Sequence, residues 1–216
     1  MPATQPQYRP VTDPAALIAA TIRAIRPSDS EAAAGADARQ GRLTKPPGAL
    51  GRLEGLATRI AGITGQSRPR LEQRLVIVAA GDHGVAAQGV SAFPAEVTAQ
   101  MVANFLEGGA AINVLASHAG ARVRVVDAGV RSETPEHPDL LRLRLGPGTD
   151  DISVGPAMTR ALAERAVAEG IALFERERTA EGVHIVALGE MGIGNSTSAA
   201  AIIAAVTALP PRSVTG

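Results

Sequence analysis

Cysteine and tryptophan are absent from the 216-residue chain, and only four residues are aromatic: Tyr8, Phe93, Phe105 and Phe174. A chain without cysteine has no disulfide, no thiolate metal site and no cysteine nucleophile. The scarcity of aromatic rings argues against a platform on which nucleic-acid bases would stack. The hydrophobic fraction of 45% comes mainly from Ala, Val, Ile and Leu, which predicts an aliphatic core.

An excess of charge of either sign is also missing. Lys and Arg number 21, Asp and Glu number 21, and the formal net charge is zero. This balance argues against an electrostatic nucleic-acid partner. The start, MPATQPQYRP, lacks the basic-then-apolar order of a signal peptide, and no apolar run approaches the ~18 residues that span a bilayer. We therefore expect a soluble cytoplasmic protein with no nucleic-acid or membrane partner.

Two helices separated by a linker are predicted near the start of the chain. Asp13 and Pro14 signal a helix start, because Asp caps free N–H groups and Pro suits the first helical position. This helix is expected to end at Pro27, and residues 27–48 are interpreted as mostly linker. Residues 49–63 form the second helix, with the apolar positions Leu50, Leu53, Leu56, Ile60 and Ile63 at helical spacing. We expect residues 1–68 to form a helical segment that belongs to a small domain.

From residue 69 onward, buried strands alternate with amphipathic helices. Strands are predicted at 75–80, 123–126 and 183–188, with a weaker one around 140–145. Helices are predicted at 94–107, 110–119, from Pro156 onward, and at 195–208. The long helix from Pro156 is expected to bury Met158, Leu162, Val167, Ile171 and Phe174. The alternation predicts an α/β domain over 69–216, in which helices cover a parallel sheet.

Three segments follow the predicted strands directly: Gly81–Gly84, Asp127–Val130 and Gly189–Asn195. Ligands of parallel sheets bind beyond the carboxyl ends of the strands. These segments are therefore the candidates for a functional site.

The third candidate, extended to Thr197, reads GEMGIGNST and joins a buried strand to a helix. Its glycines let the backbone approach a ligand, and the helix that follows presents free N–H groups, which together suit a phosphate. The alternative is an ordinary glycine turn before a capped helix. A dinucleotide site would need G-x-G-x-x-G, but Thr197 stands at the third glycine position.

Several side chains near these segments are candidates for chemistry or binding. Glu190 could act as a base or stabilise positive charge at a sugar carbon, or be a solvated loop residue. Asp82 and His83 could relay a proton or bind metal, but we favour a turn in which they bond to the backbone or line the crevice. Phe93 and Met101 could wall an apolar pocket for a flat ligand, although Met101 also suits plain core.

Five ordered landmarks, spread over about 150 residues, carry a resemblance to a known family. They are Lys45–Glu54 (KPPGALGRLE), Gly81–Val85 (GDHGV), Pro94–Thr98 (PAEVT), Asn104–Gly109 (NFLEGG) and Gly189–Asn195 (GEMGIGN). In these segments the chain resembles the N-terminal two-thirds of the nicotinate-nucleotide–dimethylbenzimidazole phosphoribosyltransferases.

The resemblance implies a pentosyltransferase of cobalamin biosynthesis. It would move the 5-phosphoribosyl group of nicotinate mononucleotide onto 5,6-dimethylbenzimidazole, giving α-ribazole 5′-phosphate and nicotinate. The implied fold is a Rossmann-like α/β domain with a small helical domain built from both ends of the chain, and family members are homodimers. No metal or cofactor is implied, because nicotinate leaves from an already activated pyridinium.

The resemblance also implies roles for individual residues. Glu190 would lie at the ribose or the base, and the N–H groups of Met191 and Gly192 would hold the ribose phosphate. Phe93 and Met101 would line the benzimidazole pocket, which their side chains would make apolar.

One part of the family pattern has no match in the 216 residues. The family's principal general-base glutamate lies in a Gly-Glu-Gly segment near the C-terminus, so we expect the chain to be a fragment or truncated. The first alternative to the enzyme is a homologue that binds ribotide or heterocycle without turnover. The second is a nucleotide-binding oxidoreductase, which the glycine pattern disfavours.

Overall fold

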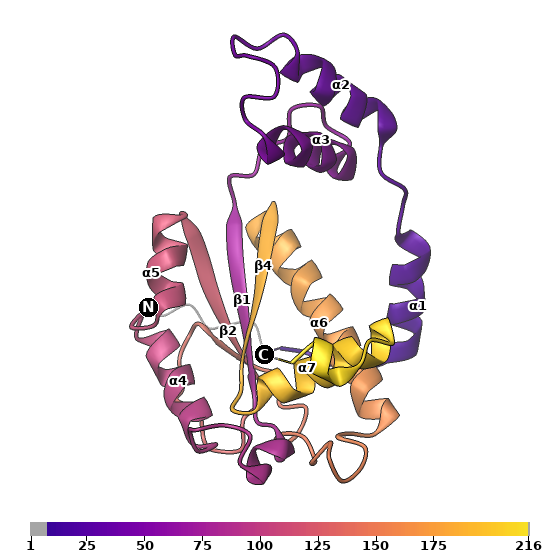
Figure 1. The fold of residues 1–216 in the computed structure, drawn as a ribbon. Helices are drawn as coiled ribbons and strands as arrows, with labels where there is room; N and C mark the ends of the chain where they lie inside the picture. Colours follow the sequence, from indigo (N-terminus) through magenta and orange to yellow (C-terminus); the bar gives the residue numbers. More distant parts are fainter. Residues whose placement is uncertain (1–7, 216) are drawn as a thin grey trace. The chain divides into compact units, whose positions relative to one another are not determined.

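The computed structural model describes residues 8–215, so residues 1–7 of the predicted N-terminal segment and Gly216 lie outside it. The chain divides into two compact units, whose elements are drawn in Figure 1. One unit consists of the described residues up to Ile18 together with those from Gln73 onward. The other is Ala19–Glu72, and the boundary falls within helix α1 (Pro14–Ala24).

The larger unit contains a four-stranded sheet in which every neighbouring pair of strands is parallel. Its strands are β1 (Arg74–Gly81), β2 (Ala121–Gly129), β3 (Leu140–Arg142) and β4 (Ile185–Met191). Their order across the sheet is β3-β2-β1-β4, so β1 is an interior strand and β4 an edge. The predicted α/β fold with a parallel sheet is confirmed.

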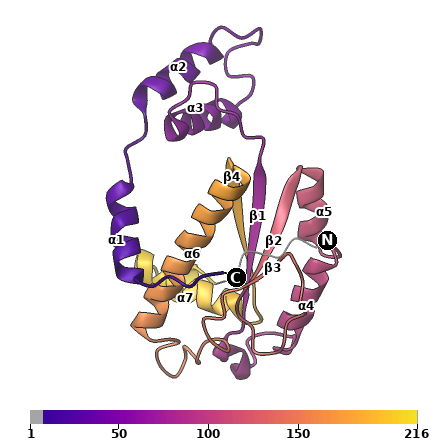
Figure 2. The same cartoon turned by 180° about the vertical axis from the view of Figure 1, so that it is seen from behind.

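Helices cover both faces of this sheet, as Figures 1 and 2 show from opposite sides. Helices α4 (Val97–Leu106) and α5 (Ala111–His118) lie on one face, and α6 (Arg160–Glu181) lies on the other. The remaining elements of this unit are α7 (Asn195–Thr207) and two 3-10 turns, η1 (Gly84–Gln88) and η2 (Pro211–Ser213).

The core follows the alternation of side chains along the strands. Val76 and Val78 of β1 pack in one cluster with residues of α4 and α5. Leu75 and Ile77 alternate with these residues and so point to the opposite face of the sheet, where they pack in a second cluster with Leu173 of α6. Because both faces of β1 are buried, its sequence shows a continuous apolar run, and this run made the strand predictable.

The buried face of α6 differs from the predicted one. Val167 is 54% exposed and Phe174 is 36% exposed, although the apolar pattern places both in the core. The residues that α6 buries are Ala168, Glu169, Leu173 and Glu177. The two carboxylates have partners: Nε of Arg124 lies 3.3 Å from Glu177, and the N–H of Val11 donates to Glu169 at 3.1 Å. These partners come from segments far away in sequence, so the periodicity of α6 alone gave no sign of them.

The smaller unit contains two packed helices, α2 (Ser30–Gln40) and α3 (Arg52–Thr64). Helix α2 corrects the prediction of a linker over residues 27–48. Its sequence, SEAAAGADARQ, has no large apolar side chain and so shows no hydrophobic period. Alanine nevertheless favours a helix, and Asp29 caps the first turn by accepting the N–H of Ala32 at 2.9 Å.

Helix α3 agrees with the helix predicted at 49–63, but its apolar stripe stays open within this unit. Leu53 is 62% exposed and Ile63 is 75% exposed. The first turn of α3 is tied to the segment before it. Nζ of Lys45 lies 2.7 Å from the carboxylate of Glu54, which also accepts the N–H of Leu50. This ion pair joins the two ends of the KPPGALGRLE landmark.

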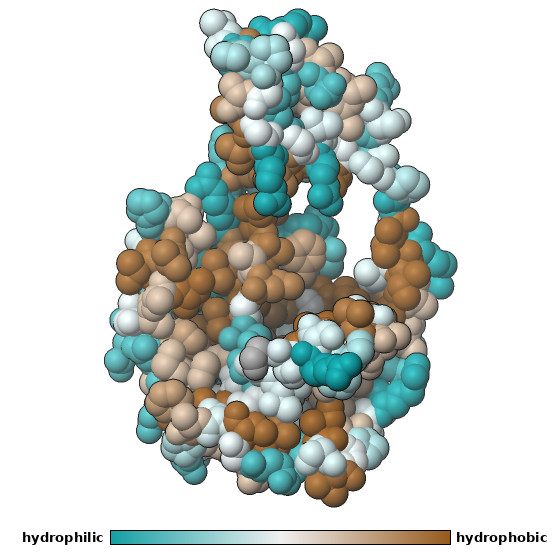
Figure 3. All heavy atoms as spheres, in the orientation of Figure 1, coloured by the Kyte–Doolittle hydropathy of each residue, from teal (hydrophilic) through white to brown (hydrophobic). Residues whose placement is uncertain are grey.

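Strand β4 carries apolar side chains that other residues do not cover. Figure 3 shows hydrophobic atoms gathered over β4 on the face in view. Leu188 is 80% exposed and Ile185 is 43% exposed. Among the described residues β4 pairs only with β1, so its outer edge is open.

Candidate active site

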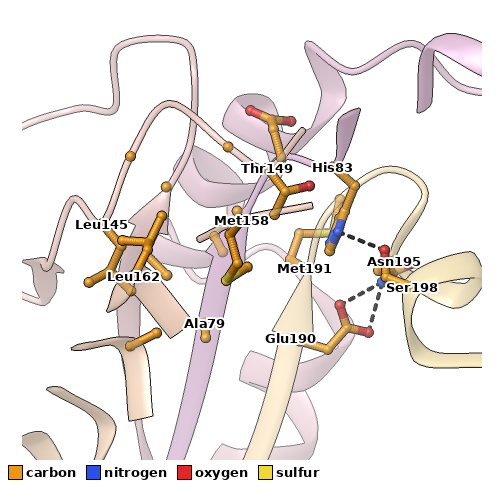
Figure 4. Close-up of a pocket in the computed structure, with 18 of the residues that line it drawn as sticks. Ala79, His83, Leu145, Thr149, Met158, Leu162, Glu190, Met191, Asn195 and Ser198 are labelled. Carbon is orange, nitrogen blue, oxygen red and sulfur yellow. Dashed lines mark hydrogen bonds between the residues drawn. The ribbon is translucent and has the colours of Figure 1, made fainter. Parts of the chain in front are cut away.

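A cavity of about 370 Å³ opens at the carboxyl ends of β1, β2 and β4 (Figure 4). All three segments predicted from the strand ends contribute to its lining. They supply mainly small residues and a few polar ones. Apolar walls come from elsewhere: Leu145, Met158, Leu162 and Ile202. The cavity is thus largely apolar, and its polar groups gather where the strands end, which is the usual design of a small-molecule site.

The turn after β4 approaches β1 so closely that only glycine fits at position 192. A Cβ there would lie 2.9 Å from Nε2 of His83 and would overlap the carbonyl oxygen of Gly81. The next residue, Ile193, donates its N–H to Oγ1 of Thr98 at 3.1 Å. Thr98 belongs to α4 and is fully buried. These contacts hold the backbone between β4 and α7 at the cavity, where a phosphate-binding turn would have to lie.

Glu190 carries a carboxylate at the cavity, and Asn195 of α7 holds it. Nδ2 of Asn195 lies 2.7 Å from each carboxylate oxygen of Glu190 (Figure 4). Oδ1 of Asn195 accepts the N–H of Ser196 at 2.7 Å, which fixes the orientation of the amide. A carboxylate held in this way could accept a proton or stabilise positive charge on a ligand.

His83 contacts the same helix through a second hydrogen bond. Its Nδ1 lies 3.0 Å from Oγ of Ser198 (Figure 4). Burial lowers the pKa of His83 below its ordinary value, and the nearby carboxylates of Glu190 and Asp82 only partly offset that effect. The lowered pKa favours the neutral ring of His83, which reduces the positive charge that it brings to the cavity.

Asp82 is buried, with an exposed fraction of 4%, and it joins the loops around the cavity. One carboxylate oxygen accepts the N–H of Arg131 at 2.8 Å, and the carbonyl oxygen accepts the N–H of Thr149 at 2.9 Å. The other carboxylate oxygen, Oδ1, is buried and has no hydrogen-bond partner among the described residues. The prediction that this residue bonds to backbone or lines the crevice agrees with both its contacts and its place in the lining.

Phe93 and Met101, the two residues expected at the heterocycle, lie outside this cavity. Phe93 precedes α4 and is 65% exposed. Met101 lies on α4 and packs against the core cluster that contains Val102 and Phe105. Neither side chain is among those that line the cavity with Glu190.

Other residues of the cavity were missing from the sequence-based prediction. Ser198 lies one turn after Asn195 on α7, so helical spacing from the glycine turn could have suggested it. Thr149 gave no such signal, because it lies in an irregular segment whose position depends on hydrogen bonds to other segments of the chain.

Two further observations concern the described residues alone. Among residues 8–215, no three His, Asp or Glu side chains gather closely enough to hold a metal ion. In the same part of the chain, no helix has both the length and the apolar character needed to cross a bilayer.

A family model described as "Phosphoribosyltransferase" matches residues 25–216. The chain belongs to this family. Curated phosphoribosyltransferases match it closely and carry the specific name that the five landmarks indicate. A nicotinate-nucleotide–dimethylbenzimidazole phosphoribosyltransferase from Roseiflexus sp. (strain RS-1) is 59% identical over 200 residues, which are 93% of this chain and 56% of that protein. The protein of the same name from Thermus thermophilus is 52% identical over 188 residues, which are 87% of this chain and 56% of that protein.

A solved phosphoribosyltransferase structure also matches. The crystal structure of CobT from Thermus thermophilus is 52% identical and has a TM-score of 0.82, covering 86% of this chain and 56% of that one. The chain therefore spans somewhat more than half the length of the relatives it matches. The family predicted from the landmarks is confirmed.

Proposed function

We propose that the cavity binds nicotinate mononucleotide and that the chain takes part in transfer of its 5-phosphoribosyl group to 5,6-dimethylbenzimidazole. The products are nicotinate and α-ribazole 5′-phosphate, an intermediate of cobalamin biosynthesis. The observation that carries this proposal is Glu190, held by Asn195 directly beside the glycine turn at the strand ends. The name of the Roseiflexus relative, 59% identical to this chain, supports it.

The chemistry needs little from the protein beyond positioning and charge. The bond between ribose C1 and the pyridinium nitrogen breaks, and its electron pair neutralises the pyridinium as nicotinate leaves. An imidazole nitrogen of dimethylbenzimidazole bonds to C1, and the N–H proton of that ring passes to a base. We assign Glu190 to the ribose carbon or the incoming base, where a carboxylate stabilises cation-like charge or accepts the proton.

The remaining assignments concern binding. The N–H groups of Met191 and Gly192 hold the ribose phosphate, since Met191 ends β4 and Gly192 begins the glycine turn before α7. Asp82 and His83 contact the ribotide from the end of β1. Phe93 and Met101, which lie around the start of α4, line the pocket for the benzimidazole. Changed preference among benzimidazoles in Phe93→Ala would test that last assignment.

We further propose a cytoplasmic homodimer, in which residues 1–68 contribute to a small helical domain. The family resemblance supports the dimer and the domain, and a chain without cysteine suits a reducing compartment. Light scattering of the purified protein measures its oligomeric state, and cell fractionation measures its location.

A direct assay tests the reaction. Purified protein is incubated with nicotinate mononucleotide and dimethylbenzimidazole, and free nicotinate is measured by chromatography. Glu190→Gln should lower turnover more than tenfold, whereas Glu175→Gln, a surface change on α6, should leave it unchanged. A decrease of less than twofold in Glu190→Gln would reject a chemical role for Glu190. Binding of the mononucleotide without release of nicotinate would contradict transfer by this chain.

A further inference from the structure

Three loops around the cavity meet at one residue that does not itself line it. Arg131 follows β2, and its backbone N–H donates to Asp82 Oδ2 after β1 at 2.8 Å. Its guanidinium donates to the carbonyl oxygens of Pro147 and Thr149, at 2.9 Å and 3.1 Å. One residue thus connects the segments that follow β1, β2 and β3.

The segment from 146 to 149, which we name the wall loop, forms one side of the cavity through Gly146, Gly148 and Thr149. It has no helix or strand of its own. Besides Arg131, it is attached through the N–H of Thr149, which bonds to the carbonyl oxygen of Asp82, and through Oγ1 of Thr149, which accepts the N–H of Gly84 at 3.3 Å.

The wall loop packs so tightly against Arg131 and Asp82 that no side chain fits at Gly148. Gly148 has φ +89°, and a Cβ there would lie 2.8 Å from the carbonyl oxygen of Asp82 and 3.2 Å from Nε of Arg131. The position of the wall loop is therefore set by these two residues. Ordering an irregular loop costs conformational entropy, and hydrogen bonds from a charged guanidinium are stronger than neutral ones.

We propose that Arg131 is a positioning residue, which fixes the wall loop against the end of β1 and so sets the shape of the ligand cavity. Its guanidinium acts through the carbonyl oxygens of Pro147 and Thr149, its backbone N–H is held by Asp82, and it does not touch the ligand. This inference rests on the proposed function for the identity of the ligand, but the attachment of the loop is a property of the free protein. The two can therefore be tested separately.

Arg142 offers a matched control. Its guanidinium also fastens an irregular segment, donating to the carbonyl oxygens of Thr134 and Pro135 at 2.8 Å and 2.7 Å. That segment does not line the cavity. Arg131→Met and Arg142→Met thus remove the same kind of contact, one at the cavity wall and one away from it.

The first measurement is hydrogen exchange of the ligand-free protein, read by mass spectrometry. Arg131→Met should accelerate exchange of the amide of Thr149 at least tenfold and leave β1 and β4 unchanged. Arg142→Met should accelerate exchange only around residues 132–139. Unchanged exchange in the wall loop of Arg131→Met would overturn the proposal, whatever the ligand is.

The second measurement is affinity for nicotinate mononucleotide by calorimetry. Arg131→Met should weaken binding at least fivefold, Arg142→Met less than twofold, and Arg131→Lys should recover part of the loss by restoring one of the two carbonyl contacts. Faster exchange with unchanged affinity would overturn the positioning role. If the unmodified protein fails to bind the mononucleotide, the proposed function fails, while the exchange experiment still decides whether Arg131 fixes the loop. Should Arg131→Met not fold, Arg131→Lys carries both measurements, with intermediate effects expected and wild-type values overturning the proposal.

Discussion

The side-chain amide of Asn195 faces the carboxylate of Glu190 at the start of α7. Nδ2 of Asn195 lies 2.7 Å from both carboxylate oxygens of Glu190. Because Glu190 is exposed, its carboxylate would otherwise be free to turn into solvent. Asn195→Leu removes the donor and keeps a side chain of similar size. We expect nicotinate release to fall about fivefold, while the free energy of unfolding changes by about 1 kcal/mol, the usual worth of one hydrogen bond. Glu175→Gln, the surface change on α6, is the control. Equal turnover in Asn195→Leu and wild type would show that the amide does not position Glu190.

Gly192 should tolerate no side chain. In Gly192→Ala the new Cβ would meet the ring of His83 and the carbonyl oxygen of Gly81, so the turn would have to move away from β1. Overpacking of this kind costs about 1–3 kcal/mol of stability, measurable by urea denaturation. The matched control is Gly170→Ala on α6, where nothing lies within 4 Å of the new Cβ and alanine favours the helix by up to about 1 kcal/mol. A neutral Gly192→Ala would mean that the close approach to His83 is not maintained in solution.

The lowered pKa of His83 makes a prediction about pH. The unfolded state binds a proton near the ordinary pKa of 6.5, whereas the folded state resists protonation until the pH is lower. Stability is therefore unaffected by His83 above about pH 6.5 and decreases as the pH falls below it, because the unfolded state then binds more protons. The melting temperature of the wild type should drop between pH 7 and pH 5, and His83→Gln should reduce that drop. His118→Gln, at an exposed site on α5, should not. An identical decline in wild type and His83→Gln would contradict the assignment.

The ion pair between Arg124 and Glu177 should matter more than a surface pair. Their side chains are only 18% and 4% exposed, and they connect β2 to the buried face of α6. Arg124→Met leaves the carboxylate of Glu177 buried with Arg176 as its remaining cationic neighbour, at 3.5 Å. We expect a loss of about 3 kcal/mol in the free energy of unfolding, which is typical when one partner of a buried pair is removed. The double change Arg124→Met with Glu177→Met should recover most of it, and purely additive losses would argue against the pair.

The parts of this fold that could be predicted from sequence are those with a local cause. The run over 75–80 is apolar on both faces, and such a run identifies an interior parallel strand by itself. The glycine turn after β4 could be assigned to the site for a similar reason, since parallel strands end at the same edge of the sheet.

The parts that could not be predicted depend on distant partners. The inward face of α6 includes Glu169 and Glu177, and these buried carboxylates depend in part on Val11 and Arg124, which are distant in sequence. Helix α2 lacked an apolar stripe because its contacts use only alanine: Ala32 and Ala36 are its buried residues.

The hydrogen bond from Ile193 to Thr98 changes how one sequence motif should be understood. The threonine ends the PAEVT landmark, yet its hydroxyl serves a backbone amide 95 residues later in the chain. Selection for the geometry of the glycine turn therefore acts on position 98, where a small buried side chain must supply the acceptor. In an alignment, a change at that position would mark a relative whose turn after β4 has a different shape, even if every glycine of the turn were still present.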